Sequence, residues 1–246
     1  MRPSDTRLHI RSEGPVMRVE LRQDDNENLL TGDTWGQLAE AFEVLPPEIR
    51  VVVLSGGGPS FSVGGDRTEV AELVEGDPSG ESVRQLAERG RRALDAIGTC
   101  DAVTIARVHG RVMGGGFCLM LGCDLRVATD DALFAMPEMR LGLPPVWGGT
   151  LARMISEIGM ARTRELVLTS DVIDAVTAQR YGVVNKVVPA ADVDAAVEQW
   201  AQPLARRRPT TVRTAKTVLR AYERAARLAD ATLLDSHLMA AAIANS

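Results

Sequence analysis

The alternation of apolar and polar residues near the N-terminus predicts a strand, a helix and a second strand. Val16–Leu21 alternates as a half-buried strand does. The next apolar positions are spaced three or four residues apart, as on one face of a helix. They are Trp35, Leu38, Ala39, Phe42 and Leu45. Thr31 or Asp33 is suited to cap this helix, and Pro46 ends it. Arg50–Ser55 contains a run of apolar residues that favours a buried strand.

Two glycine-rich segments each follow a predicted strand. Gly56–Asp66 comes after the strand at Arg50–Ser55, and Gly114–Gly116 comes after the β-branched run Ala102–Val108 and before a predicted helix that includes Phe117. Glycines leave backbone N–H groups uncovered, and the first N–H groups of a helix lack internal partners. Both segments are therefore candidate oxyanion or phosphate sites, with close packing of the chain as the alternative. Their recurrence after about 50 residues favours parallel strands joined by crossover helices.

The middle of the chain continues this α/β pattern. Glu81–Ile97 is a charged amphipathic helix, and Leu125–Ala128 and Leu133–Ala135 are short strands. The proline- and glycine-rich segment 136–150 then predicts a long ordered loop, in which Glu138 is an acid among apolar neighbours. Such a carboxylate is either solvent-exposed or has a perturbed pKa.

The last part of the chain is predicted to be helical. Gly182–Pro189 interrupts the helical pattern as a strand that ends at proline. Residues 193–246 then form two or three amphipathic helices with few turn residues, which is common in oligomerisation regions. We therefore divide the chain into a core, 1–192, and a C-terminal helical region, 193–246.

Composition excludes several classes of protein. The chain has 246 residues, 45% of them hydrophobic, and a net charge of −5 without a basic patch, so nucleic acid is not an expected partner. Three cysteines without a Cys-x-x-Cys pair suggest neither disulfides nor a metal site. The polar N-terminus and the lack of a long apolar run argue against a membrane partner. A reducing cytoplasm is the expected location.

Four ordered motifs resemble the crotonase, or enoyl-CoA hydratase/isomerase, superfamily. The first is the strand Arg50–Ser55 with Phe61–Asp66, and the second is Gly110–Asp124 with its three consecutive glycines. The third is Pro137-Glu138 with the glycines and prolines up to Thr150, and the fourth is Gly182–Pro189. The resemblance covers most of the chain. It implies a spiral of ββα turns with a C-terminal helical region, a homotrimer or hexamer, an acyl-CoA substrate and no cofactor.

The resemblance also implies the roles of site residues. The backbone N–H groups of Gly65 and Gly115 would hold the thioester oxygen of an enolate, and Glu138 would be the catalytic acid or base. Val63, Gly64, Asp66, Gly114 and Trp147 would line the substrate site. Trp147 would narrow the acyl pocket, with core packing as the alternative. The carboxylates of Asp66 and Asp124 are interpreted as structural.

Cys118 departs from the family pattern. Hydratases carry a glutamate three residues after the middle glycine of the triplet, where this chain has a cysteine. A thiol is mostly neutral near pH 7 and hydrogen-bonds weakly, so it activates water poorly. One carboxylate suits a double-bond isomerase better than a hydratase. Cys118 itself is expected to be a buried core residue.

Two other functions stay open at this point. The first is a biosynthetic enzyme whose enolate forms or cleaves a C–C bond, and the second is an acyl-CoA-binding protein without turnover. Decarboxylating relatives use a histidine near His237 together with a loop lysine, but no lysine occurs between Arg50 and Lys186. His109 is interpreted as a turn residue.

Overall fold

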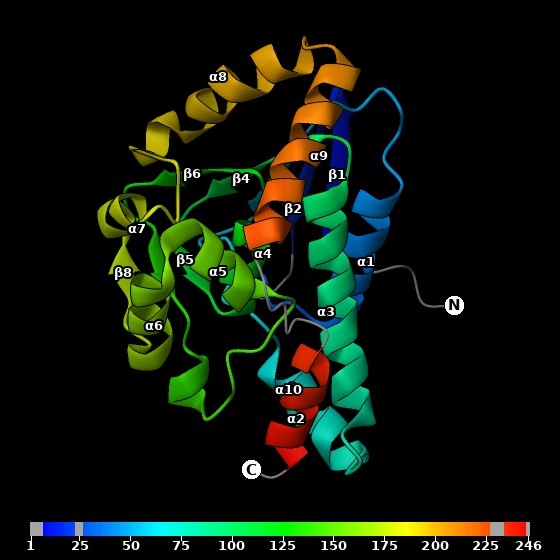
Figure 1. Ribbon diagram of the computed structural model, residues 1–246, viewed down its shortest axis with the longest axis vertical. Helices are drawn as coiled ribbons and strands as arrows, with labels where there is room; N and C mark the ends of the chain where they lie inside the picture. The colour runs from blue at the N-terminus through cyan, green and yellow to red at the C-terminus, as the bar shows by residue number, and fades with distance from the viewer. Residues whose placement is uncertain (1–6, 23–26, 227–233, 245–246) are drawn as a thin grey trace.

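The computed structural model describes residues 7–22, 27–226 and 234–244, and within them the main sheet has six strands (Figure 1). The strand order is β1-β2-β3-β4-β6-β9; β1 and β2 are antiparallel and the other neighbours are parallel. Its strands are β1 (Leu8–Glu13), β2 (Val16–Leu21), β3 (Val51–Gly56), β4 (Val103–Val108), β6 (Leu125–Thr129) and β9 (Lys186–Val188). The parallel arrangement that the repeated strand and glycine segments predicted is confirmed.

A small second sheet gives the chain its spiral course. It consists of β5 (Arg111–Met113), β7 (Leu133–Ala135) and β8 (Ile173–Asp174), in the order β5-β7-β8. The chain runs through β4, β5 and the helix α4 (Gly115–Leu121), and then β6 returns beside β4 while β7 returns beside β5. Each ββα turn therefore adds one strand to each sheet.

Helices cover both faces of the main sheet. Those before β9 are α1 (Gly32–Glu43), α2 (Arg67–Gly76), α3 (Glu81–Thr99), α4, η1 (Glu138–Leu141), α5 (Thr150–Ile158), α6 (Met160–Thr169) and α7 (Ala175–Tyr181). The later ones are η2 (Ala190–Asp192), α8 (Val193–Ala205), α9 (Pro209–Ala226) and α10 (Asp235–Ala244). Alternate residues of β3 divide the core: Val52 and Leu54 pack with α1, α3 and α4, whereas Val51 and Val53 pack with α8.

The periodicity of the first predicted helix is confirmed, but the helix ends at Glu43, so Leu45 follows it and is only partly buried. Trp35, Leu38, Ala39 and Phe42 of α1 are all buried in the larger core. Thr31, rather than Asp33, is the N-cap, and its hydroxyl accepts a hydrogen bond from the Thr34 amide at 3.2 Å. This helix places the indole of Trp35 deep in the protein.

Sequence periodicity did not predict β1 or α2. Only Leu8 of β1 is buried, since this strand lies at the edge of the sheet, and α2 has no buried residue. Neither segment has the hydrophobic stripe on which the prediction depends. In α2, Val70 and Leu73 are only partly buried against the larger core.

The C-terminal helices pack on the rest of the chain. α8 lies across the sheet and contacts β3, β4 and β6, and α10 lies alongside α3 (Figure 1). In α9, the buried Lys216 ammonium lies 2.7 Å from Asp124 Oδ2 and donates a hydrogen bond to the Ala102 carbonyl at 2.6 Å. The helical character predicted for 193–246 is present in α8, α9 and α10, and residues 227–233 and 245–246 of this region lie outside the described residues. Its role in oligomerisation stays a prediction. No helix in the described ranges is long and apolar enough to cross a bilayer.

Candidate active site

The Gly65 amide is directed away from its neighbouring strand. Leu30 bridges Gly65 in a parallel pairing, in which the Leu30 amide donates to the Gly64 carbonyl at 2.8 Å and the Asp66 amide donates to the Leu30 carbonyl at 3.4 Å. In such a parallel bridge the residue between the two hydrogen-bonded neighbours, here Gly65, directs its own N–H group away from the partner strand that contains Leu30. No described residue accepts a hydrogen bond from the Gly65 amide.

The Gly115 amide lies across from Gly65. A Cβ atom on Gly115 would lie 3.4 Å from the Gly65 nitrogen, and one on Gly64 would lie 3.1 Å from the Gly115 nitrogen and 2.8 Å from the Met113 carbonyl oxygen. Gly64 has φ +99°, a conformation that side chains rarely adopt. The two glycine segments therefore approach each other closely and place two amides side by side. Within the described part of the chain, the Gly115 amide has no acceptor either.

Glu138 lies beside these glycines as the first residue of η1. Its Oε1 atom is 3.0 Å from the position that a Cβ atom on Gly114 would occupy. Its Oε2 atom is buried and has no hydrogen-bond partner among the described residues. Burial raises the pKa of the carboxyl group above its ordinary value. The carboxyl group therefore takes up and releases a proton closer to neutral pH than a solvated glutamate does.

Cys118 is buried one turn after Gly114 in α4, and its amide donates to the Gly114 carbonyl at 3.0 Å. Burial raises the pKa of its thiol, the nearby Glu138 carboxylate raises it further, and a hydrogen bond with the Thr150 side chain opposes the shift. The thiol is therefore neutral near pH 7. The structure confirms that Cys118 is a buried residue, and it places the thiol next to the acid.

Two of the residues predicted to line the substrate site, Asp66 and Val63, make hydrogen bonds within the protein. The Asp66 carboxylate is the N-cap of α2, where Oδ1 accepts from the Thr68 and Glu69 amides at 2.8 and 3.3 Å. The Val63 amide donates to the Glu27 carbonyl at 3.0 Å. Both residues hold the first glycine segment in place, which agrees with the structural interpretation of the Asp66 side chain.

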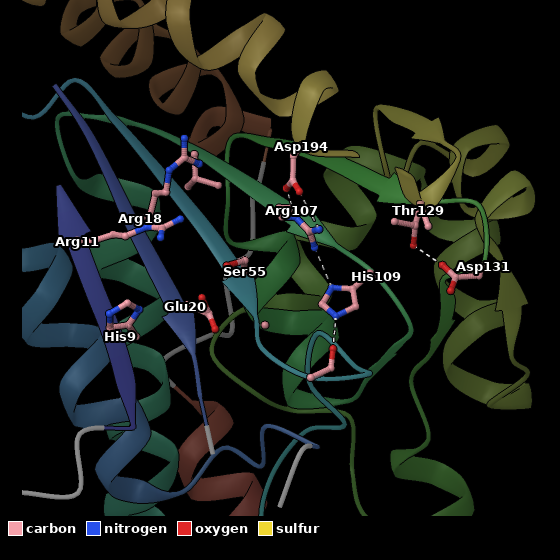
Figure 2. A pocket seen from close by; sticks show the side chains of 14 residues that line it. His9, Arg11, Arg18, Glu20, Ser55, Arg107, His109, Thr129, Asp131 and Asp194 are labelled. Carbon is pink, nitrogen blue, oxygen red and sulfur yellow. Dashed lines mark hydrogen bonds and ion pairs between the residues drawn. The ribbon is translucent and has the colours of Figure 1, made fainter. Parts of the chain in front are cut away.

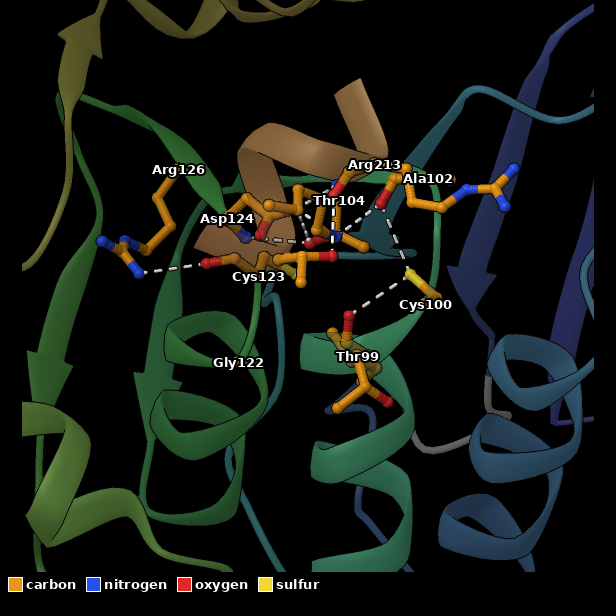
Figure 3. A network of polar contacts seen from close by, with 12 residues as sticks. Thr99, Cys100, Ala102, Thr104, Gly122, Cys123, Asp124, Arg126 and Arg213 are labelled. Atoms are coloured by element: carbon orange, nitrogen blue, oxygen red, sulfur yellow. Dashed lines mark hydrogen bonds and ion pairs between the residues drawn. The ribbon is translucent and has the colours of Figure 1, made fainter. Parts of the chain in front are cut away.

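Asp124 also has a structural environment (Figure 3). Its Oδ2 atom accepts hydrogen bonds from the Thr104 amide and hydroxyl at 2.8 and 3.0 Å, in addition to the Lys216 ion pair. These contacts join the end of α4 to β4 and α9. The structural interpretation of Asp124 is confirmed.

Trp147 lies beside the site and packs on a second tryptophan, Trp35. The two ring centroids are 6.0 Å apart and the planes are inclined by 42°. Trp35 Cζ2 is 3.5 Å from the position of a Cβ atom on Gly115, so this ring borders the glycine segments. The sequence did not distinguish Trp35 from the other core residues of α1. Thr150 was also missed, because only the fold brings it to Cys118.

The histidines do not lie with Glu138. His109 Nε2 is 2.9 Å from the Gly58 carbonyl oxygen, and its Nδ1 is 3.3 Å from Arg107. This arrangement agrees with a turn residue. His237 is an exposed residue of α10.

A cavity of about 440 Å³ lies on the opposite face of the main sheet (Figure 2). Its lining includes His9, Arg18, Arg107, His109 and Asp194. The charges pair with one another, since Arg107 bonds to Asp194 at 2.5 Å and Arg18 bonds to Glu198. The lining includes Gly56 and Gly58 at the start of the first glycine segment, but not Gly65, Gly115 or Glu138. In the described ranges, no group of three or more histidine, cysteine or acidic residues could hold a metal ion.

This chain is similar to known proteins along most of its length. A family model described as enoyl-CoA hydratase/isomerase matches residues 11–246. A protein named carnitinyl-CoA dehydratase from Salmonella heidelberg is 33% identical over 217 residues, which cover 87% of this chain and 80% of that protein.

Solved structures agree with this similarity. An enoyl-CoA hydratase/carnithine racemase structure from Magnetospirillum magneticum has a TM-score of 0.84 and 28% identity, and the match covers 94% of this chain and 86% of that one. A Thermobifida fusca structure, assigned as an enoyl-CoA hydratase in complex with CoA, has a TM-score of 0.81 and 32% identity over 96% and 91% of the two chains. The expected crotonase-like fold is confirmed.

Proposed function

Because the chain belongs to the enoyl-CoA hydratase/isomerase family, we propose that it holds an acyl-CoA thioester with its carbonyl oxygen between the amides of Gly65 and Gly115. The proximity of these amides and the lack of a described acceptor for either support this role. Negative charge develops on that oxygen when a proton leaves the neighbouring carbon. A fixed donor at such an oxygen is worth about 3 kcal/mol of barrier.

The proposed reaction shifts a double bond from carbon 3 to carbon 2 of the acyl chain. Glu138 removes a proton from carbon 2, and the electron pair enters the thioester as an enolate. Glu138 then returns a proton to carbon 4 while the double bond forms between carbons 2 and 3. The single observation that carries this proposal is the buried Oε2 atom of Glu138, which has no partner among the described residues, beside the neutral thiol of Cys118. The proposed chemistry needs one base and no cofactor.

A second candidate reaction is the dehydration or hydration of a short acyl-CoA. It is favoured by the relatives named carnitinyl-CoA dehydratase, which are 33% identical to this chain. In this reaction Glu138 would have to handle water without a second carboxylate at position 118. We rank it below isomerisation because a neutral thiol activates water poorly.

Product analysis separates the two reactions. Purified protein is incubated with 3-hexenoyl-CoA and, separately, with 2-hexenoyl-CoA, and the products are resolved by chromatography. Isomerisation predicts formation of 2-hexenoyl-CoA from the first substrate and no 3-hydroxyhexanoyl-CoA from the second. Rapid hydration of 2-hexenoyl-CoA that survives the substitution Glu138→Gln would contradict the proposal.

We also propose that the protein assembles as a homotrimer or hexamer. Exposed apolar side chains on α9 support this proposal: Val218, Leu219 and Tyr222 are 47%, 69% and 74% exposed. Sedimentation equilibrium tests it, and a monomer at micromolar concentration would contradict it.

A further inference from the structure

Trp35 borders the two glycines of the candidate oxyanion site. The residue is 1% exposed, and its Cζ2 atom is the closest Trp35 atom to the Cβ position of Gly115, at 3.5 Å. Cζ2 and Nε1 are bonded to the same ring carbon, so the N–H group lies two bonds from the atom that contacts this position. The same Cβ position is 3.4 Å from the Gly65 amide nitrogen.

The Trp35 N–H group is unpaired although it is buried. Nε1 has no hydrogen-bond partner among the described residues. Indole nitrogen is only a donor, and a buried tryptophan N–H normally has an acceptor because an unpaired one costs stability. The nearby Oε2 atom of Glu138 is also buried and unpaired. A donor and an acceptor are thus both left for a bound molecule.

Trp147 closes the space behind Trp35. Its Nε1 and Cζ2 atoms are 2.7 Å from the position of a Cβ atom on Gly90, so the indole occupies the space that a side chain at position 90 would need. Gly90 lies inside α3, where glycine is less favourable than alanine. The packing of Trp147 is therefore the physical reason for glycine there. Trp147 Nε1 is also buried without a partner among the described residues, but it lies against Gly90 of α3, whereas the Trp35 atom nearest Gly115 is two bonds from Nε1.

We propose that the Trp35–Trp147 pair forms the end of the acyl-binding site and selects a short acyl group that carries an oxygen acceptor, which the Trp35 N–H group binds. This inference rests on the proposed function, because it assumes a thioester at Gly65 and Gly115. Trp147 sets the length limit and Trp35 supplies the polar contact. An acyl group that lacks the acceptor leaves the buried donor unpaired, so it still binds but more weakly.

Calorimetric binding of thioesters that carry no double bond, and so cannot be isomerised, tests the proposal. The probes are butyryl-CoA and 3-hydroxybutyryl-CoA, which differ in one hydroxyl group. We expect the protein to bind the hydroxylated thioester about tenfold more tightly. Trp35→Phe keeps an aromatic ring but removes the N–H group, and it should abolish this preference. The matched control, Trp147→Phe, removes the N–H group that faces α3 and should retain the preference.

Two further probes complete the test. Decanoyl-CoA should bind more weakly than butyryl-CoA, and Trp147→Ala should reverse that order. Equal affinity for the first two thioesters, or a preference that Trp35→Phe retains, would overturn the proposal. Tighter binding of 4-trimethylammoniobutyryl-CoA than of 3-hydroxybutyryl-CoA would also overturn it, in favour of recognition of a cation by the aromatic faces. If the protein prefers 3-hydroxybutyryl-CoA to butyryl-CoA but does not isomerise 3-hexenoyl-CoA, the role of Trp35 in binding stands and the proposed reaction fails.

Discussion

The carboxylate of Glu138 lies over the backbone of Gly114, with Oε1 3.0 Å from the position that a Cβ atom at residue 114 would occupy. Gly114 has φ +49°, so both its conformation and its neighbour favour glycine. The next residue, Gly115, supplies one of the two unpaired amides. A proposed base and a proposed oxyanion donor are therefore held together by one tight turn.

We predict that Glu138→Gln lowers kcat for isomerisation by about 10³-fold, because glutamine cannot accept the proton. Steady-state assays with 3-hexenoyl-CoA test this effect. Binding of butyryl-CoA should stay within a few-fold of the unsubstituted protein, since the side chain keeps its size. Retention of more than a tenth of kcat would be inconsistent with a single catalytic base.

The activity of the unsubstituted protein should depend on the ionisation of Glu138. Burial raises the pKa of this carboxyl group above the ordinary value of 4.5. The reaction starts from the ionised form, so kcat/KM should rise with pH through a range that lies above pH 4.5. A profile that is flat down to the ordinary pKa would contradict the assignment. Stopped assays in buffers of constant ionic strength provide the measurement.

The same pKa shift predicts how stability depends on pH. Below the ordinary pKa the carboxyl group is protonated in both the folded and the unfolded chain, and its burial costs little. As the pH rises towards the folded-state pKa, the unfolded chain loses the proton first, and the free energy of unfolding falls. Glu138→Gln should therefore be more stable than the unsubstituted protein at pH 7 but not at pH 4. Urea denaturation at both pH values tests this, and equal effects would contradict it.

Substitution by alanine should affect the stability of the fold differently at Gly64 and at Gly65. A Cβ atom on Gly64 would lie 2.8 Å from the Met113 carbonyl oxygen at φ +99°, whereas one on Gly65 would meet only the Leu30 carbonyl oxygen, at 4.0 Å. We expect Gly64→Ala to destabilise the fold by about 2 kcal/mol and Gly65→Ala to change it by much less. Thermal unfolding of both variants tests this. Similar losses of stability in the two would show that the close approach of the loops is wrong.

Lys216 should matter for stability rather than for catalysis. Its side chain is buried and neutralises Asp124, so Lys216→Met leaves that carboxylate without its cation and should cost about 3 kcal/mol. The double variant with Asp124→Asn should recover part of this loss. Denaturation in urea provides the measurement. If the double variant is less stable than Lys216→Met alone, the carboxylate does not depend on the ammonium group in this way.

The sequence predicted the elements that have a strong apolar period. The stripe from Trp35 to Phe42 and the apolar run of β3 are both found, because burial of one face determines these elements. The edge strand at Leu8–Glu13 and the exposed helix α2 lack such a pattern. Their positions depend on pairing with β2 and on the Asp66 cap, which only the folded chain provides.

The candidate site was partly accessible to sequence reasoning. The glycine segments and Glu138 could be found because their residue types carry backbone exposure and acid–base chemistry. Trp35 was hidden in a helical stripe that is explained by core packing alone. Thr150 and Cys118 are 32 positions apart in the chain, and only the fold brings their side chains into contact.

Incorporation of solvent deuterium is the most direct test of Glu138 as the single base of an enolate mechanism. The protein is incubated with 3-hexenoyl-CoA in deuterated water, and the thioester is analysed by mass spectrometry beside the Glu138→Gln variant. We expect deuterium at carbon 2 or carbon 4, no addition of water, and no label with the variant. Addition of water, or label that persists without the Glu138 carboxylate, would contradict a one-base enolate mechanism.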